Sequence, residues 1–385
     1  MPTMHKPRQD SSDFAPAAGA TRRDFLGMAL AGCAGGLFSA SFAGCGGTNA
    51  RTVCNRRVRD AHTGAVLALA AAPAGTLLAS GGEDALIKLW QLPDGALVSS
   101  LAGHLGSVTA VAISPDGTLL ASAGVDATIK LWNLADGSLR TSITGHAGGV
   151  TCIAFSPDGR ILASGGADAT VRLWNSANGS SLVPPLAGHA LGVTALAMRA
   201  DGTYLVSAAQ DLTFRLWSVA DGSAIAAIPV DAAITALALS ADGTLMASGG
   251  AGDGVTLWTM PASSPAGALA PISGSIRALA MSPAETTLAS GGSGGVVQLW
   301  RLSSGKEAHE IRDHSVSADA SLGAAANSPA AASVTALAVV PPAGTMLITA
   351  SDDRSIRFWQ LSDGKYLGSA DDPAMPLHTV VSFSC

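Results

Sequence analysis

The chain has 385 residues, with 22 Lys and Arg against 28 Asp and Glu, a formal net charge of −6. Only 13% of its residues are charged, so it lacks the dense cationic surface that nucleic-acid binding requires. Its five cysteines form no Cys-x-x-Cys pair, which argues against a cysteine-built zinc site.

Residues 1–44 are predicted to be an export signal. The stretch Thr21–Gly27, TRRDFLG, resembles the twin-arginine signal, in which the pair formed here by Arg22 and Arg23 precedes an uncharged stretch. The alternative is a transmembrane helix, but repeated glycines weaken that stretch as a helix. The resemblance implies export to the bacterial cell envelope, to the periplasm or the outer face of a membrane.

A lipid-attachment site is expected at the end of this signal. Phe42–Cys45 resembles a bacterial lipobox, although Phe replaces the usual Leu. The resemblance implies lipidation at Cys45, a linker over residues 45–51 and membrane attachment through a lipid anchor. Ordinary cleavage near Ala43 and lipidation at Cys33, which lies close to the arginines, are the alternatives.

The rest of the chain is an internal repeat marked by tryptophan. Successive tryptophans are separated by 42, 42, 43, 41, 42 and 59 residues. The seven are Trp90, Trp132, Trp174, Trp217, Trp258, Trp300 and Trp359. A period near 42 residues is typical of a four-stranded propeller blade.

Each repeat contains four short runs that are predicted to be strands. In the second repeat these are residues 108–113, 118–122, 128–132 and 138–143, separated by turns rich in Pro, Asp and Gly. The runs are too short for helices. The sequence therefore predicts an all-β fold over residues 52–385, a seven-bladed β-propeller of four-stranded antiparallel blades.

The repeats resemble the WD-repeat family of β-propellers over about residues 52–370. The resemblance implies that a His, a Ser or Thr, an Asp and a Trp form a buried hydrogen-bonded chain within each blade. Four repeats carry the whole set: His62, Ser80, Asp84, Trp90; His104, Ser122, Asp126, Trp132; His146, Ser164, Asp168, Trp174; and His189, Ser207, Asp211, Trp217.

The other three repeats depart from this pattern. The seventh keeps Thr349, Asp353 and Trp359, with His314 displaced by an insertion. The fifth and sixth have Gly252 and Gly294 at the Asp position and no preceding His, so these two blades are expected to be softer. The Asp that usually follows the Trp in this family is absent from every repeat.

The His, Ser and Asp sets are not expected to be catalytic. A catalytic triad does not occur four times in one domain, whereas mutually bonded buried groups explain the spacing without chemistry. The first run of each repeat should line the central channel and carries no His, Asp or Glu cluster, so no metal or cofactor is expected.

The expected function is that of a non-catalytic protein–protein interaction scaffold of the bacterial envelope. We expect a monomer with protein partners of unknown identity. The alternatives are an envelope propeller enzyme and a sensor, in either case with a site outside the repeat core.

A partner surface is expected on the loops at one end of the blades. Most loop residues there are small, and the larger candidates are Glu83, Leu105, Leu191, Gln210, Asp352 and Arg354. An insertion at residues 315–331, rich in Ser and Ala, is expected to be a flexible solvated loop, with a partner-binding lip on the same face as the alternative.

Two segments compete to complete the last blade. We expect the N-terminal run Thr52–Val58 to add its fourth strand, as is usual in the family, but Asp363–Gly368 matches the same place. Cys54 and Cys385 lie near the two ends of the chain, so in an oxidising envelope they are candidates for a disulfide.

Overall fold

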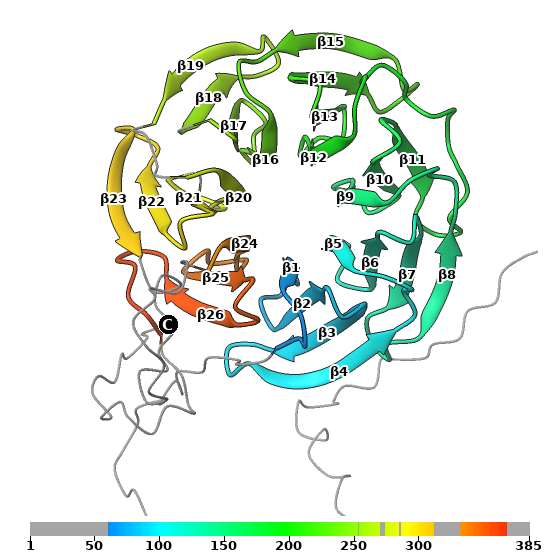
Figure 1. Cartoon of the computed structure of the whole chain (residues 1–385), viewed down its shortest axis with the longest axis horizontal. Coiled ribbons are helices and arrows are strands. Elements are labelled where there is room, and N and C mark those ends of the chain that lie inside the picture. Colours follow the sequence, from blue (N-terminus) through cyan, green and yellow to red (C-terminus); the bar gives the residue numbers. More distant parts are fainter. Residues whose placement is uncertain (1–60, 253, 270–273, 285, 312–331, 368–385) are drawn as a thin grey trace, which may run out of the picture. The chain divides into compact units, whose positions relative to one another are not determined.

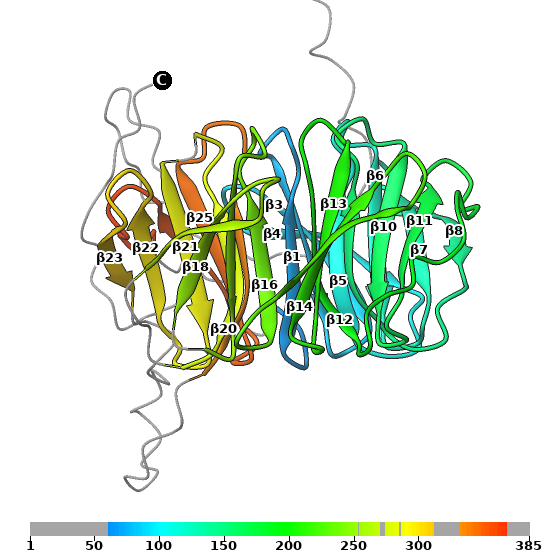
Figure 2. The ribbon, with the colours of Figure 1, turned by 90° about the horizontal axis from the view of Figure 1, so that it is seen from above.

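The computed structural model describes residues 61–252, 254–269, 274–284, 286–311 and 332–367. Every regular element in these ranges is a β-strand, and the strands form seven antiparallel sheets arranged in a ring (Figures 1 and 2). The predicted all-β seven-bladed propeller is confirmed. None of the described residues belongs to a helix able to cross a membrane.

Several predicted features fall outside the described residues. They are the export signal, Arg22, Arg23, Cys33, Cys45, Cys54, the strand Thr52–Val58, His314, the insertion 315–331 and Cys385.

The first strand of each blade lies nearest the centre of the ring (Figure 1). Each of these strands begins with Val or Ile, whose branched side chains suit a pleated, packed surface. They are β1 (Val66–Ala71), β5 (Val108–Ile113), β9 (Val150–Phe155), β12 (Val193–Met198), β16 (Ile234–Leu239), β20 (Ile276–Met281) and β24 (Val334–Val339).

The second and third strands are the buried body of each blade. The second strands are β2 (Leu77–Gly82), β6 (Leu119–Gly124), β10 (Ile161–Gly166), β13 (Tyr204–Ala209), β17 (Leu245–Gly250), β21 (Thr287–Gly292) and β25 (Met346–Ser351). The third strands, which carry the tryptophans, are β3 (Leu86–Gln91), β7 (Ile129–Asn133), β11 (Val171–Asn175), β14 (Thr213–Ser218), β18 (Val255–Thr259), β22 (Val297–Arg301) and β26 (Ile356–Gln360).

Five blades have a regular fourth strand at the rim. These strands are β4 (Ala96–Ala102), β8 (Leu139–Ile143), β15 (Ala224–Pro229), β19 (Ser264–Ala268) and β23 (Lys306–Ile311). In the third blade two isolated bridges, Val171 to Leu186 and Trp174 to Ser181, replace it. Pro184 and Pro185 lie between the bridges in the sequence, and proline cannot donate to a ladder.

The turn between the first and second strands explains the repeated Ser-Pro-Asp-Gly sequence. In the second blade the Ser114 hydroxyl donates to Asp116 at 2.5 Å and accepts from the Leu119 N–H at 2.9 Å. Gly117 has φ of 70°, a conformation that glycine adopts at little cost. These side-chain bonds fix where β6 begins.

The hydrophobic core lies between neighbouring blades. Trp132 of the second blade packs with Ala68 and Leu89 of the first, together with Val108 of its own blade. Phe358 of the seventh blade packs in the same way against the first, so the ring is closed by apolar contact.

A row of threonines ties five of the seven blades to the next blade. A Thr hydroxyl at the second position of the first strand donates to a main-chain carbonyl of the following blade. The pairs are Thr109 with Val150, Thr151 with Val193, Thr194 with Ile234, Thr235 with Ile276 and Thr335 with Val66. Leu67 and Arg277 occupy this position in the first and sixth blades.

The C-terminal candidate segment reaches the outer edge of β26 in the described residues. The Leu367 N–H donates to the Phe358 carbonyl at 2.9 Å, and Tyr366 forms an isolated β-bridge with Trp359. The C-terminal segment therefore occupies this part of the edge of β26, and the expectation that an N-terminal strand occupies it is wrong. At the other end the Ala61 N–H donates to the Arg354 carbonyl at 3.0 Å. For residues 52–58 the N-terminal strand stays a prediction.

Candidate functional site

The third blade shows how the four repeat residues meet. Ser164 Oγ accepts the Trp174 indole N–H at 2.8 Å and lies 2.8 Å from His146 Nε2. Because this oxygen already accepts from the indole, we infer that the hydroxyl proton goes to Nε2 and that Nδ1–H donates to Asp168 at 3.0 Å. Asp168 also accepts the Ala147 N–H at 2.9 Å.

The first, second and fourth blades repeat this geometry. The Ser to His Nε2 distances are 2.8, 2.8 and 2.7 Å, and the indole to Ser distances are 2.9, 2.9 and 2.8 Å. In each blade the Asp accepts from Nδ1 and from the N–H that follows the His. The sets therefore join the loop before the first strand to the second and third strands.

Burial sets the charge state of these groups. Desolvation lowers the pKa of His146 below its usual value, and the Asp168 carboxylate only partly offsets this. Burial opposes the ionisation of Asp168, but the Ala147 N–H and the His146 ring outweigh it and leave its pKa at about 2. The pair is thus a neutral imidazole beside a carboxylate, which is suited to structural bonding.

The seventh blade keeps part of the set. Trp359 donates to Thr349 Oγ1 at 2.9 Å, as the other tryptophans do to serine. Asp353 forms an ion pair with Arg357 at 2.8 Å, and that guanidinium is almost fully buried.

The fifth and sixth blades keep only the Ser to Trp bond. Trp258 donates to Ser248 at 2.7 Å and Trp300 donates to Ser290 at 2.9 Å. In the fifth blade Val230 stands where the His would be, at the same 28-residue distance from the Trp, and Gly252 stands at the Asp position.

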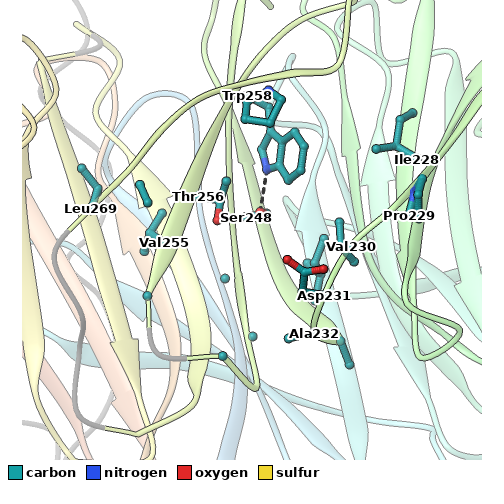
Figure 3. Close-up of a pocket in the computed structure, with 18 of the residues that line it drawn as sticks. Ile228, Pro229, Val230, Asp231, Ala232, Ser248, Val255, Thr256, Trp258 and Leu269 are labelled. Atoms are coloured by element: carbon teal, nitrogen blue, oxygen red, sulfur yellow. Dashed lines mark hydrogen bonds between the residues drawn. The ribbon is translucent and has the colours of Figure 1, made fainter.

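These replacements coincide with a pocket of about 850 Å³ between the fourth and fifth blades (Figure 3). Its lining includes Val230, Asp231, Ser248, Gly252, Thr256 and Trp258. The sequence marked this blade as irregular, but the pocket was not predicted from it.

The candidate partner residues lie on loops at one end of the blades and are exposed. Glu83 and Asp352 also join two loops of their own blade, the one after the second strand and the one before the first strand. Glu83 accepts the Ala65 N–H at 3.1 Å, and Asp352 accepts the Ser333 N–H at 2.8 Å. Leu105 is 94% exposed and Leu191 is 52% exposed.

Two further apolar residues, missed in the sequence, extend this surface. Val125 is 55% exposed and Leu212 is 44% exposed. Val125 follows β6 beside Leu105, because its N–H bonds Ser107 at 3.1 Å in the loop that carries Leu105. Leu105, Val125, Leu191 and Leu212 are called the apolar loop surface below. The signal was present in the sequence, since Val125 aligns with Glu83 of the first blade.

The described part of the chain holds no cluster of three or more metal-ligating side chains. Cys152 is a free thiol on β9, and burial raises its pKa to about 12. A thiol with so little thiolate is a poor nucleophile and a poor metal ligand.

Comparison with known proteins agrees with this architecture. The family model described as WD domain, G-beta repeat matches seven segments: residues 54–91, 95–133, 137–175, 180–218, 228–259, 268–301 and 327–360. No curated protein matches the chain. The seven matched segments cover more than half of the sequence and each contains the first three strands of one blade, so the chain belongs to the WD-repeat family of β-propellers.

Proposed function

We propose that this propeller is a non-catalytic protein–protein interaction scaffold of the bacterial cell envelope. WD-repeat propellers commonly serve as such scaffolds. The apolar loop surface is the observation that carries the proposal. Exposed leucine and valine side chains on neighbouring loops at one end of a ring are characteristic of a protein-binding surface.

The loops of this surface adjoin one another across three blades. A methyl group added at Gly149 would lie 3.1 Å from the Val125 backbone, and one added at Gly192 would lie 3.3 Å from Ala167. These close approaches connect the loops of the second, third and fourth blades. A partner can therefore contact Leu105 and Leu191 at the same time.

The burial of the His, Ser and Asp sets supports a role without catalysis. Ser80, Ser122, Ser164 and Ser207 are each 0% exposed. Each hydroxyl oxygen also accepts an indole N–H, which occupies the position that a substrate would need. A nucleophile requires an approach path for its substrate.

The proposed location rests on the sequence. The twin arginines Arg22 and Arg23 would direct export, and Cys45 would carry the lipid. Replacing both arginines by lysine should leave the protein in the cytoplasm. Replacing Cys45 by alanine should release it from the membrane fraction without stopping export. Membrane association that is unchanged in the Cys45 variant would contradict the lipid anchor.

Photo-crosslinking in intact cells tests the scaffold role. A photo-reactive amino acid at Leu105 should capture a defined protein. The same group at Leu139, which is 48% exposed on β8 at the rim, is the matched control and should not capture that protein. Capture of the same species from both positions, or no capture from Leu105, would contradict the proposal.

A further inference from the structure

The pocket between the fourth and fifth blades lies where the imidazole of the fifth blade would be expected. In the fourth blade the His189 ring lies against Trp217 with centroids 6.2 Å apart and planes at 63°. Its Nε2 is 2.7 Å from Ser207 and its Nδ1 is 3.0 Å from Asp211. The fifth blade keeps the Trp and the Ser but has Val and Gly at the other two positions.

Ser248 is the polar group left without its second partner. It is 4% exposed, lines the pocket and accepts the Trp258 indole N–H at 2.7 Å. In the fourth blade the corresponding Ser207 proton is directed to an imidazole nitrogen, but no acceptor for the Ser248 proton is present among the described residues. A buried hydroxyl proton without an acceptor favours binding of a group that supplies one.

The walls of the pocket are mostly apolar. Phe214 packs edge-on against Trp258, with ring centroids 4.9 Å apart, and holds the indole in place. Val255 and Thr256 lie on one side of the pocket, and Val230 and Asp231 lie on the other (Figure 3). The exposed Asp231 makes no hydrogen bond or ion pair with the described residues, so its carboxylate is available to a ligand N–H.

We propose that this pocket binds a neutral imidazole ring, or a similar planar heteroaromatic ring with one acceptor nitrogen. Ser248 Oγ–H donates to the acceptor nitrogen, the Trp258 indole packs against the ring, and Asp231 accepts from the ring N–H. The ring belongs either to a small molecule or to a histidine side chain of a protein. Both sources present the same chemistry to the pocket.

Titration of the purified propeller with free imidazole tests the site. The indole N–H resonances are followed by ¹⁵N NMR at pH 8, which lies above the pKa of the imidazole ring and keeps the ligand mostly neutral. The Trp258 signal, assigned with a Trp258→Phe variant, should shift saturably with a dissociation constant on the order of millimolar, as suits so small a ligand. The Trp217 signal of the filled fourth blade should not shift.

Matched ligands and variants make the test specific. Pyrrole has the same ring size but no acceptor nitrogen, so it should bind at least tenfold more weakly. The Ser248→Ala variant should bind imidazole more weakly by a similar factor. Val230→His combined with Gly252→Asp should abolish binding by filling the pocket, and a Cβ at Gly252 would meet only the Ala232 Cβ, at 3.4 Å. This double variant keeps the test available if Ser248→Ala fails to fold.

Three results would overturn the assignment: no saturable Trp258 shift with imidazole, equal binding of pyrrole, or unchanged imidazole binding in the variant that fills the pocket. A short peptide with one histidine separates the two sources of the ring. If the peptide binds at least tenfold more tightly than imidazole, the ring belongs to a protein side chain. If the peptide gains less than this, the ring belongs to a small molecule.

Discussion

The hydroxyl of Thr335 in the seventh blade donates a hydrogen bond to the main-chain carbonyl of Val66 in the first blade, 269 residues away in the sequence. This bond is one of five such threonine contacts, and it links the last blade to the first. It joins strands β24 and β1, at the junction where the apolar core also passes from the last blade to the first.

Thr335→Val should weaken this junction. The substitution keeps the shape of the side chain and removes the donor, so we expect a loss of about 1 kcal/mol in the free energy of unfolding. Urea denaturation measures it. Arg277→Thr is the converse variant, because it places the threonine hydroxyl in the sixth blade where the sequence has arginine, and it should stabilise the ring. An unchanged midpoint in both variants would show that the threonines contribute nothing.

Replacement of the blade serine by alanine should lower the stability more in a blade with the full His, Ser, Asp and Trp set than in a blade that keeps only the Ser and the Trp. Ser164→Ala removes the partner of both Trp174 and His146, whereas Ser248→Ala removes the partner of Trp258 alone. We expect losses of about 2–3 and about 1 kcal/mol in the free energy of unfolding. Equal losses would mean that the imidazole bond adds no stability.

Stability should fall as the pH falls from 7.5 to 5. Burial lowers the pKa of His62, His104, His146 and His189 in the folded state, so the unfolded chain takes up protons first. The stabilisation is complete above the unfolded value of about 6.5 and is lost as the pH falls towards the folded values. Each histidine adds a slope of up to about 1.4 kcal/mol per pH unit.

Denaturation at a series of pH values checks this expectation. His146→Gln, which cannot titrate, should reduce the slope even though it also lowers the stability. A stability that does not change with pH, or that increases as the pH falls towards 5, would contradict the expected protonation states.

The fifth blade should open more readily than the third. Its network lacks the His and Asp bonds that hold the loop before the first strand. Amide hydrogen exchange in β17 should therefore be faster than in β10, and Val230→His with Gly252→Asp should slow it. Equal protection of the two strands would show that the apolar core alone sets blade stability.

The tryptophan period was enough to predict the blades, because each Trp fills the space between two neighbours and so recurs once per blade. The contacts around Ser164 could be anticipated from residue types and spacing, since a buried indole needs an acceptor. The threonine contacts were missed because their acceptors are main-chain carbonyls, which no side chain marks. The pocket was missed because it results from the absence of a side chain, and Val230 by itself looks like an ordinary strand residue.

The threonine row and the apolar core couple each blade to two neighbours, so the ring is a closed series of nearest-neighbour couplings. In an open repeat array, one failed coupling separates the two parts. Here one failed coupling leaves every blade attached to at least one neighbour. The first and sixth blades, with Leu67 and Arg277 in place of threonine, can therefore lack a hydrogen-bonded link while the remaining couplings hold the circle. Redundancy of this kind lets single copies of the repeat change without loss of the whole fold.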